Sequence, residues 1–172
     1  WDSVDLGFKP TKRTWGAEVF PGSSLPNAMV QVSPDTKFHS GAGYQYEDSV
    51  IYGFTHTNKG HWNLCHIPLL PVTGTPTPGD YCSPFSHERE SAAPGYYQVF
   101  LDRYGVDAQL SSTLRCAFHK YTYPAGAAAS LLADLQRSNE HVRAWDIRKE
   151  GDNVFAGWQQ TGEKMYFYAC LL

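Results

Sequence analysis

Residues 85–124, FSHERESAAPGYYQVFLDRYGVDAQLSSTLRCAFHKYTYP, decide the fold class. Tyr96 to Leu101 alternates around an aromatic core, Asp102 to Val106 is a turn, and Val106 to Leu110 alternates again. Ser112 to Tyr123 is predicted as a further strand, because its apolar residues recur with period two. Turn signals about every ten residues are typical of an antiparallel β-sandwich of two packed sheets.

The rest of the chain extends this all-β pattern. A short strand is predicted over Ala28 to Val32, closed by a turn at Ser33 to Thr36. His66 to Val72 is an extended apolar run whose two prolines suit an edge or a strand end, and residues 73–80 form a loop. Three further strands are predicted over Val142–Ile147, Asn153–Gln159 and Lys164–Leu172. The expected core aromatics are Tyr96, Tyr97, Phe100 and Phe118.

Residues 125–138 leave two interpretations open. Leu131, Leu132 and Leu135, among many alanines, suit a helix. The same residues also alternate as they would in a strand.

Composition narrows the function classes. The chain has 172 residues, 42% of them hydrophobic and 18% charged, which suits one globular domain over residues 1–172. The net charge is −3 and no basic run occurs, which argues against a nucleic-acid partner. No stretch approaches the roughly twenty apolar residues needed to span a bilayer.

The four cysteines, Cys65, Cys82, Cys116 and Cys170, form no CxxC pair. Four cysteines allow two disulfides in three connectivities or none, and free or partly paired thiols are favoured. The chain starts at Trp1 without Met and stops within an apolar run, so we expect a processed or truncated chain.

Residues 51–66, IYGFTHTNKGHWNLCH, carry the densest group of ligand-binding side chains. An aromatic, β-branched run breaks there into a polar loop that contains His56, His61, Trp62, Cys65 and His66. Proteins commonly build a ligand site from such a loop on a rigid scaffold, although a loop packed by its own aromatics has the same composition. Trp62 beside His61 fits sugar recognition, in which an apolar ring face stacks on a pyranose and polar groups reach its hydroxyls.

Two other chemistries are weaker alternatives. The three histidines with Cys65 could ligate zinc only if a folded loop brought them together, since their spacing of five scatters them on a strand or a helix. Glu88 and Glu90 would share one face of an extended chain, about 7 Å apart, which is formally compatible with the carboxyl spacing of an inverting glycosidase. Two carboxylates in a polar segment are, however, usually a solvated surface.

Five ordered motifs together resemble the N-terminal domain of glycoside hydrolase family 92, the calcium-dependent exo-acting α-mannosidases. The motifs are VFPGSSLPNAMVQVSPDT (19–36), GYQYEDSVIYGFTHT (43–57), IPLLPVTG (67–74), FSHERESAAPGYYQVFL (85–101) and STLRCAFHKYTYP (112–124). The later run GDNVFAGWQQTGEKMYFYACLL (151–172) is similar to the last recognisable part of the same domain. The resemblance covers nearly the whole chain from about Phe20.

The resemblance implies a β-sandwich that packs, in the parent enzyme, against a larger helical (α/α)-barrel domain. It places the general acid, general base and calcium ligands mainly in that helical domain, so no catalytic or metal-ligating residue is assigned in this chain. The sandwich would contribute the floor of a mannose pocket through Phe20, Pro21 and Gly22 and through His56, His61 and Trp62. Trp62 would stack on the sugar, and the parent enzyme would be secreted or periplasmic.

The chain differs from the family pattern in one loop and in its length, and the resemblance also decides between helix and strand for one segment. Family members often carry a Gly-rich loop ending in an acid where this chain has NKGHWNLCHIP, with His66 near the position of the acid, so the linkage preference is open. The resemblance favours a strand over Ala128–Leu135. It also implies that 172 residues leave no room for the barrel and are short even for the complete sandwich.

Two functions are therefore carried forward. The first is a portion of an exo-α-mannosidase that hydrolyses terminal α-linked mannose with inversion, active only beside its helical domain. The second is a stand-alone carbohydrate-binding sandwich without chemistry.

Overall fold

The computed structural model describes residues 20–39, 41, 43–58 and 64–172. In this part of the chain every strand pairing is antiparallel, and the one helical element is the 3-10 turn η1 (His87–Arg89). The prediction of an all-β antiparallel fold is confirmed. None of the described helical residues forms a segment long and apolar enough to cross a membrane.

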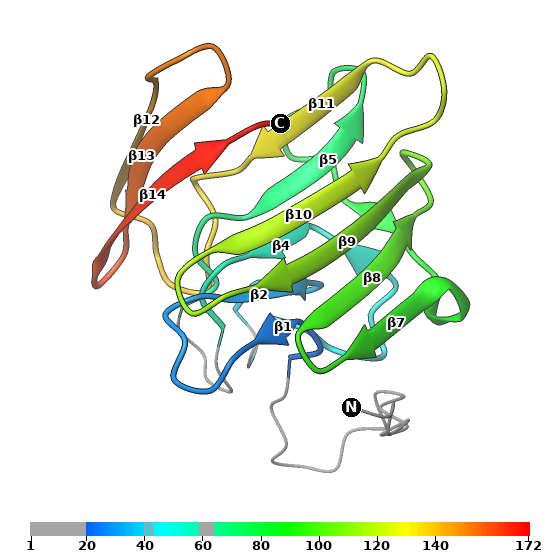
Figure 1. Ribbon diagram of the computed structural model, residues 1–172, viewed down its shortest axis with the longest axis horizontal. Helices are drawn as coiled ribbons and strands as arrows, with labels where there is room; N and C mark the ends of the chain where they lie inside the picture. Colours follow the sequence, from blue (N-terminus) through cyan, green and yellow to red (C-terminus); the bar gives the residue numbers. More distant parts are fainter. Residues whose placement is uncertain (1–19, 40, 42, 59–63) are drawn as a thin grey trace.

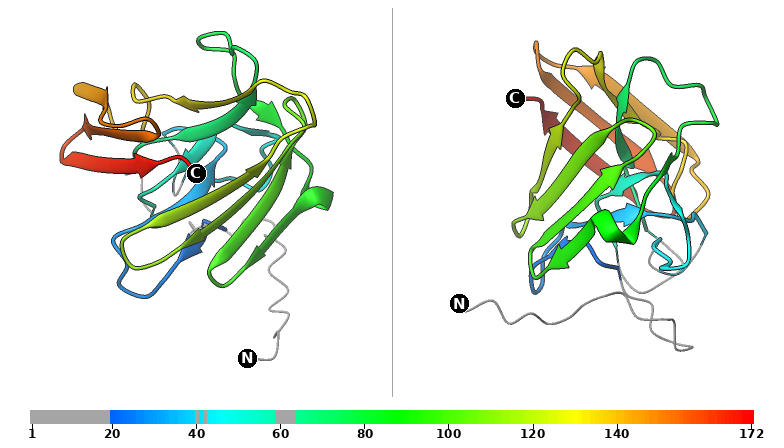
Figure 2. Two further views of the ribbon diagram at one scale, coloured as in Figure 1. Left: turned by 45° about the horizontal axis from the view of Figure 1, so that its top comes forward. Right: turned by 90° about the vertical axis from the view of Figure 1, so that its right-hand side faces the viewer.

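Two sheets form the sandwich (Figure 1). The five-stranded sheet has the order β1 (Ser23–Ser24), β2 (Gln31–Asp35), β4 (Gly53–Thr55), β5 (Leu69–Thr73) and β11 (Ala129–Ala133). The four-stranded sheet has the order β10 (Ala117–Thr122), β9 (Val106–Ser112), β8 (Tyr96–Leu101) and β7 (Glu90–Ala93). Strand β9 packs across β1, β2 and β5, and Figure 2 shows the green strands as one layer against the blue and cyan strands.

Both layers supply the core between them. Alternate residues of β8 and β9 face inward, as their period of two requires. They meet side chains from the opposite sheet and its loops, and the cluster comprises Val32, Tyr44, Ile51, Phe54, Leu70, Val72, Tyr81, Phe85, Tyr97, Val99, Leu101, Tyr104, Val106, Ala108 and Leu110. Tyr97 is a core aromatic as predicted, whereas the assignment of Tyr96 and Phe100 to the core is wrong, because they are half-buried on the opposite face of β8 and lie outside this cluster.

Two smaller sheets complete the fold. A three-stranded sheet of β12 (Ala144–Lys149), β13 (Val154–Gln160) and β14 (Lys164–Cys170) is set off to one side of the sandwich (Figure 2), and β3 (Val50–Ile51) pairs with β6 (Ser83–Pro84). The three strands predicted in this C-terminal part are confirmed, with ends shifted by one or two residues. A separate third sheet was not expected, and β12 is exposed along its whole length.

Residues 125–138 contain a strand, β11, which agrees with the choice that the resemblance favoured. It pairs along its whole length with β5, from Ala129 opposite Thr73 to Ala133 opposite Leu69. Leu131 and Leu132 therefore lie on the edge strand of the five-stranded sheet, and Leu135 follows it as a buried residue.

The prediction of one strand over Ser112–Tyr123 is wrong in its first part. Strand β9 continues to Ser112, a turn follows, and β10 begins at Ala117. Thr113 closes the turn, because its hydroxyl accepts hydrogen bonds from the N–H groups of Arg115 and Cys116 at 3.4 and 3.1 Å. Phe118 lies on the outer face of β10 and is 60% exposed, so its assignment to the core is also wrong.

The strand predicted over Ala28–Val32 occurs three residues later, as β2. Its residues from Val32 to Asp35 are all buried, so the alternation that marks a half-exposed strand is absent. Pro34 lies within it, although a turn was expected there. Strand β1 pairs with β2 only as far as Val32. Beyond Val32 the β1 side of β2 has no partner strand, so the missing N–H of Pro34 is tolerated there.

Strand β5 is an inner strand rather than an edge. Pro71 is tolerated because β4 pairs with β5 only at Leu69, which leaves the β4 side of Pro71 without a ladder partner. All four cysteines are free, in agreement with the unpaired alternative.

Candidate functional site

The structure describes both ends of the segment that carries the predicted sugar-binding residues. We call Thr55–Asn58 the first foot and Leu64–Ile67 the second foot. His61 and Trp62 lie between them, at positions 59–63, outside the described residues, and their sugar-binding role stays a prediction.

Asn58 anchors the first foot to the five-stranded sheet. Its side-chain amide donates to the carbonyl oxygens of Gln31 at 2.8 Å and of Thr55 at 3.2 Å. Its amide oxygen accepts from the Thr55 hydroxyl at 3.2 Å and from the Cys65 thiol at 3.4 Å. A buried amide with all these bonds made is fixed in one orientation, and it links the two feet directly.

The second foot has an unusual backbone. Leu64, Cys65 and Ile67 have φ values of 73°, 58° and 56°, in the left-handed region that is unfavourable for residues with a side chain. Such a conformation costs on the order of 1–3 kcal/mol per residue and persists only where the surroundings over-determine it.

Hydrogen bonds from distant elements supply that constraint. The side-chain oxygen of Gln159, on β13, accepts from the Ile67 N–H at 2.9 Å, and its amide group donates to the carbonyls of Leu135 and Arg137 at 3.0 and 2.8 Å. The Leu64 carbonyl accepts from the Asn139 N–H at 3.0 Å. The third sheet and the segment before it therefore hold the second foot against the sandwich.

His66 is buried within this framework. Its Nδ1 lies 2.8 Å from the Thr57 hydroxyl and its Nε2 lies 2.9 Å from the Thr161 hydroxyl. Burial lowers the pKa of His66. A ring that bridges the first foot and the end of β13 supports the site from inside the protein.

His56 is also bonded on both ring nitrogens. Its Nδ1 lies 2.7 Å from the Ile67 carbonyl oxygen, and its Nε2 lies 3.0 Å from Nε2 of His119 on β10. Burial lowers the pKa of His56 to about 4, so the ring is neutral at pH 7. A direct contact of His56 with a sugar stays a prediction, and it would require one of these nitrogens to be released.

A buried carboxyl group lies beside the feet. Asp35 is fully enclosed, and among the described residues no hydrogen-bond partner reaches either of its carboxyl oxygens. Burial raises its pKa to about 8, and the neighbouring Lys37 N–H and Cys65 thiol offset the rise only in part. Burial likewise raises the pKa of the Cys65 thiol, which makes a poor nucleophile of it.

The early-loop residues lie at the same sheet. Gly22 is half-buried, and a Cβ there would fall 1.9 Å from the Val32 carbonyl oxygen and 2.5 Å from the Ser33 Cα. This contact with β2 requires glycine. Phe20 is half-buried, and a sugar-binding role for both residues stays a prediction.

A cavity of about 710 Å³ opens next to the second foot. Its lining is Phe38, His39, Gln136, Arg137, Ser138, Glu140, His141, Val142, Arg143, Ala144 and Trp145. Asn139 connects it to the foot: it donates to Leu64 and also holds His39, whose Nδ1 lies 2.8 Å from the Asn139 carbonyl oxygen. Aromatic rings beside hydrogen-bonding groups are the lining that a sugar requires.

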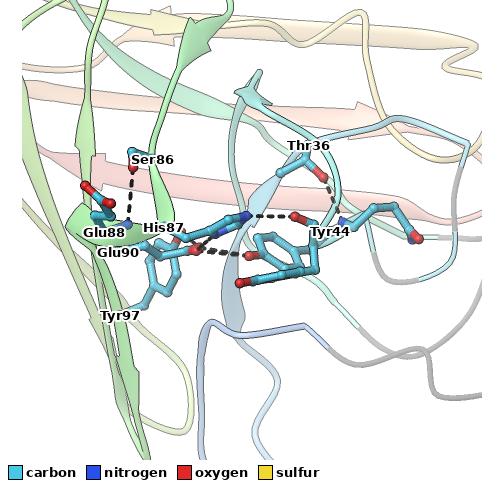
Figure 3. Close-up of polar contacts among 9 residues, drawn as sticks. Thr36, Tyr44, Ser86, His87, Glu88, Glu90 and Tyr97 are labelled. Carbon is cyan, nitrogen blue, oxygen red and sulfur yellow. Dashed lines mark hydrogen bonds and ion pairs between the residues drawn. The ribbon is translucent and has the colours of Figure 1, made fainter. Parts of the chain in front are cut away.

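The carboxylates of Glu88 and Glu90 do not form a pair. Glu88 lies in η1 and is exposed, whereas the Glu90 side chain is only 5% exposed. Glu90 accepts from the Tyr97 hydroxyl at 2.6 Å, from the Tyr44 hydroxyl at 3.0 Å, and faces His87 Nδ1 at 2.5 Å (Figure 3). The extended geometry assumed from the sequence fails because η1 turns Glu88 away from this cluster.

The zinc alternative gains no support. In residues 20–39, 41, 43–58 and 64–172 no group of three His, Cys, Asp or Glu side chains could hold a metal ion. His56 and His66 are each used in other hydrogen bonds.

The supporting residues were missed from the sequence. Asn58, His119, Asn139, Gln159 and Thr161 come from four separate segments, and the cavity residues Phe38 and Trp145 from two more. No local signal identified them, because the alternation of β10 and β13 does not show from the sequence alone which face is enclosed.

Comparison with known proteins shows the family and the fold of the chain. The sequence profile of the glycosyl hydrolase family 92 N-terminal domain matches residues 9–171. The structure is similar to that of a family 92 α-mannosidase from Bacteroides thetaiotaomicron in complex with mannoimidazole, with a TM-score of 0.81 and 29% identity over 88% of this chain and 22% of that chain. An inverting family 92 mannosidase from the same organism shares the fold, with a TM-score of 0.74 and 23% identity over 88% of this chain and 22% of that chain. No curated protein sequence matches the chain. The chain thus spans about a fifth of the length of these solved relatives.

Proposed function

Because the chain belongs to the N-terminal domain family of glycosyl hydrolase family 92, we propose that it forms part of the mannose pocket of an exo-α-mannosidase. The complete enzyme would hydrolyse terminal α-linked mannose from glycans with inversion. The similarity to a mannosidase that binds mannoimidazole supports this substrate class.

The observation that carries the proposal is the way both feet are held. Three left-handed residues and hydrogen bonds from β2, β13 and the segment at Asn139 fix the ends of positions 59–63. Strain maintained by surrounding structure is concentrated at binding and catalytic sites. Feet fixed in this way are the rigid scaffold on which proteins commonly present a binding loop.

In this proposal Trp62 supplies the stacking face for the sugar ring, and His61 a hydrogen-bonding group. Phe20 and Gly22 contribute the early-loop side of the pocket, and His56 and His66 support the loop. The chemistry belongs to a helical domain of the same polypeptide, which would supply the acid and the base.

Calcium would be held by that helical domain. The described residues of this chain do not offer a fitting ligand set, since no three acidic, thiol or imidazole groups among them converge. No part of the role proposed for this chain depends on the ion. We also propose that the parent enzyme is secreted or periplasmic.

The test is Trp62→Ala in the full-length enzyme, with mannose affinity measured by calorimetry. Loss of a stacking face of about 1–3 kcal/mol raises Kd by about 5-fold to 150-fold. Tyr168→Ala, which truncates an aromatic that is 69% exposed on β14, is the matched control and should leave Kd unchanged. An unchanged Kd in Trp62→Ala would remove Trp62 from the pocket.

A second candidate function, carbohydrate binding without catalysis, is favoured by the cavity with Phe38 and Trp145 on its wall. Mannose release from an α-mannoside separates the two. The first function predicts release by the full-length protein and none by the 172-residue chain. Release by the short chain, lost on chelation, would contradict the assignment of catalysis to the helical domain.

A further inference from the structure

Two histidine rings meet across the two layers of the sandwich. His56 follows β4 in the five-stranded sheet, and His119 lies on β10 in the four-stranded sheet. Their Nε2 atoms are 3.0 Å apart, and the His119 Nδ1 lies 2.6 Å from the Tyr121 hydroxyl. At the other end, His56 Nδ1 lies 2.7 Å from the Ile67 carbonyl oxygen.

The chemistry of the two ends gives this chain of bonds one direction. A carbonyl oxygen only accepts, so His56 Nδ1 carries the proton and donates to Ile67. In a neutral ring His56 Nε2 is then an acceptor, and His119 Nε2 must donate to it. His119 Nδ1 is left as an acceptor, which the Tyr121 hydroxyl satisfies as donor.

Both rings are neutral at pH 7. Burial lowers the pKa of His56 to about 4, and burial together with the neighbouring His56 lowers the pKa of His119 well below its usual value. Burial raises the pKa of Tyr121, so its hydroxyl keeps its proton. Each nitrogen of the chain therefore has one defined state.

The series of hydrogen bonds ends at the Ile67 peptide of the second foot, which is held on both sides. Ile67 is β-branched and has a φ of 56°, which is a strong outlier for such a residue. Its N–H donates to Gln159 from one side, and its carbonyl accepts from His56 on the other. Removing either partner would leave a buried peptide group unpaired and free the backbone to relax.

We propose that Tyr121, His119 and His56 form a one-way chain of hydrogen bonds by which β10 positions the second foot through the Ile67 carbonyl. His119 and Tyr121 are positioning residues, remote in sequence from the foot that they hold. The link from this foot to mannose binding rests on the proposed function, but the hydrogen-bond chain itself does not.

The test is nitrogen-15 NMR of the histidine rings of the 172-residue chain at pH 7. The expected result is a proton on Nδ1 of His56 and on Nε2 of His119, although free histidine prefers Nε2. In Tyr121→Phe, His119 loses its Nδ1 donor while His56 keeps its tautomer. A proton on Nε2 of His56 in the unmodified chain overturns the proposal.

Two substitutions at His119 separate positioning from packing. His119→Phe keeps a ring but removes the donor, so Nε2 of His56 loses its partner and the amide signals of Leu64 to Ile67 should shift, while the Ile67 carbonyl keeps the His56 proton on Nδ1. His119→Gln restores a donor at the ε position and should retain the original tautomer and signals. Equal behaviour of the two variants would overturn the proposal, because a packing role does not distinguish a donor from an apolar ring.

A last measurement addresses the coupling to function. In the full-length enzyme, His119→Phe should weaken mannose binding about 3-fold to 10-fold, and His119→Gln should not. If the tautomers are as expected but mannose does not bind, the proposed function fails while the hydrogen-bond chain stands.

Discussion

Two buried carboxyl groups of this sandwich, Glu90 and Asp35, are treated in opposite ways. Glu90 faces three donor groups, the hydroxyls of Tyr44 and Tyr97 and the ring of His87. Asp35 is fully enclosed beside the second foot, with no partner on either oxygen among the described residues. Glu90 therefore stabilises the fold through its hydrogen bonds, whereas the burial of the Asp35 carboxyl group costs free energy.

The Glu90 cluster joins parts of the chain far apart in sequence. Tyr44 comes from the loop before β3, Tyr97 from β8, and His87 from η1, and His87 also faces the Tyr46 carbonyl at 2.8 Å. Removing the centre of this cluster would leave two hydroxyls and a ring nitrogen unpaired. Asp35, in contrast, has no partner at normal hydrogen-bond geometry among the described residues, and the Lys37 N–H and Cys65 thiol beside it offset the cost of burial only in part, so its substitution can relieve a penalty.

The largest expected effect is that of Glu90→Ala. We expect the free energy of unfolding, measured by urea denaturation, to fall by about 3–5 kcal/mol, because buried donors lose their acceptor. Glu88→Ala, two residues away and exposed, should change it by less than about 0.5 kcal/mol. Equal effects of the two substitutions would show that burial of Glu90 does not matter.

Asp35→Asn tests the other carboxyl through pH. The folded pKa of about 8 lies above the value of 3.8 in the unfolded chain, so the folded state keeps a proton that the unfolded state has lost. Asp35 therefore contributes full stability below about pH 4, and this contribution is lost as pH rises through 8. At about 1.4 kcal/mol per pH unit, the free energy of unfolding should fall by about 2 kcal/mol from pH 6.5 to 8, and Asp35→Asn should remove this fall.

The buried histidines provide an internal control for that measurement. The folded pKa of His56, about 4, lies below its usual value of 6.5, so the unfolded state takes up a proton first and stability is lost as pH falls from 6.5 towards 4. This acid-side loss should persist in Asp35→Asn. A variant that kept the alkaline fall would show that another group titrates there.

Tyr44→Phe gives the smallest expected effect and probes how the Glu90 cluster shares its bonds. The Tyr44 hydroxyl is placed between both carboxylate oxygens, at 3.0 and 3.1 Å, while Tyr97 and His87 remain bonded without it. We expect a loss of about 1 kcal/mol in urea denaturation. A loss as large as that of Glu90→Ala would indicate that the cluster acts as one cooperative unit.

Local pattern was sufficient where a strand has one buried face. Tyr96–Leu101 was predicted with the ends that the structure shows, because apolar residues recur at every second position on its inward face. Tyr96 and Phe100, on the outward face, were nevertheless assigned to the core. The pattern failed for β2, which is buried on both sides, and at Phe118, where alternation identified two faces but not which of them meets the core. In β10 the inner face is that of His119 and Tyr121.

The candidate site was predicted only as a stretch of chain. Residues 51–66 could be singled out because stacking and hydrogen-bonding side chains are dense there. The bonds that hold the two feet could not, since Gln31, His119, Asn139 and Gln159 are distant in sequence and no local spacing relates them.

The sequence by itself determined the all-β class, most strands and the family, because alternation and ordered motifs are written along the chain. Only the tertiary structure decided which polar residues are enclosed and with what partners. Burial and hydrogen bonding depend on elements brought together from the whole chain. Glu90 and Asp35, which are both acidic residues in the sequence, therefore have opposite physical roles.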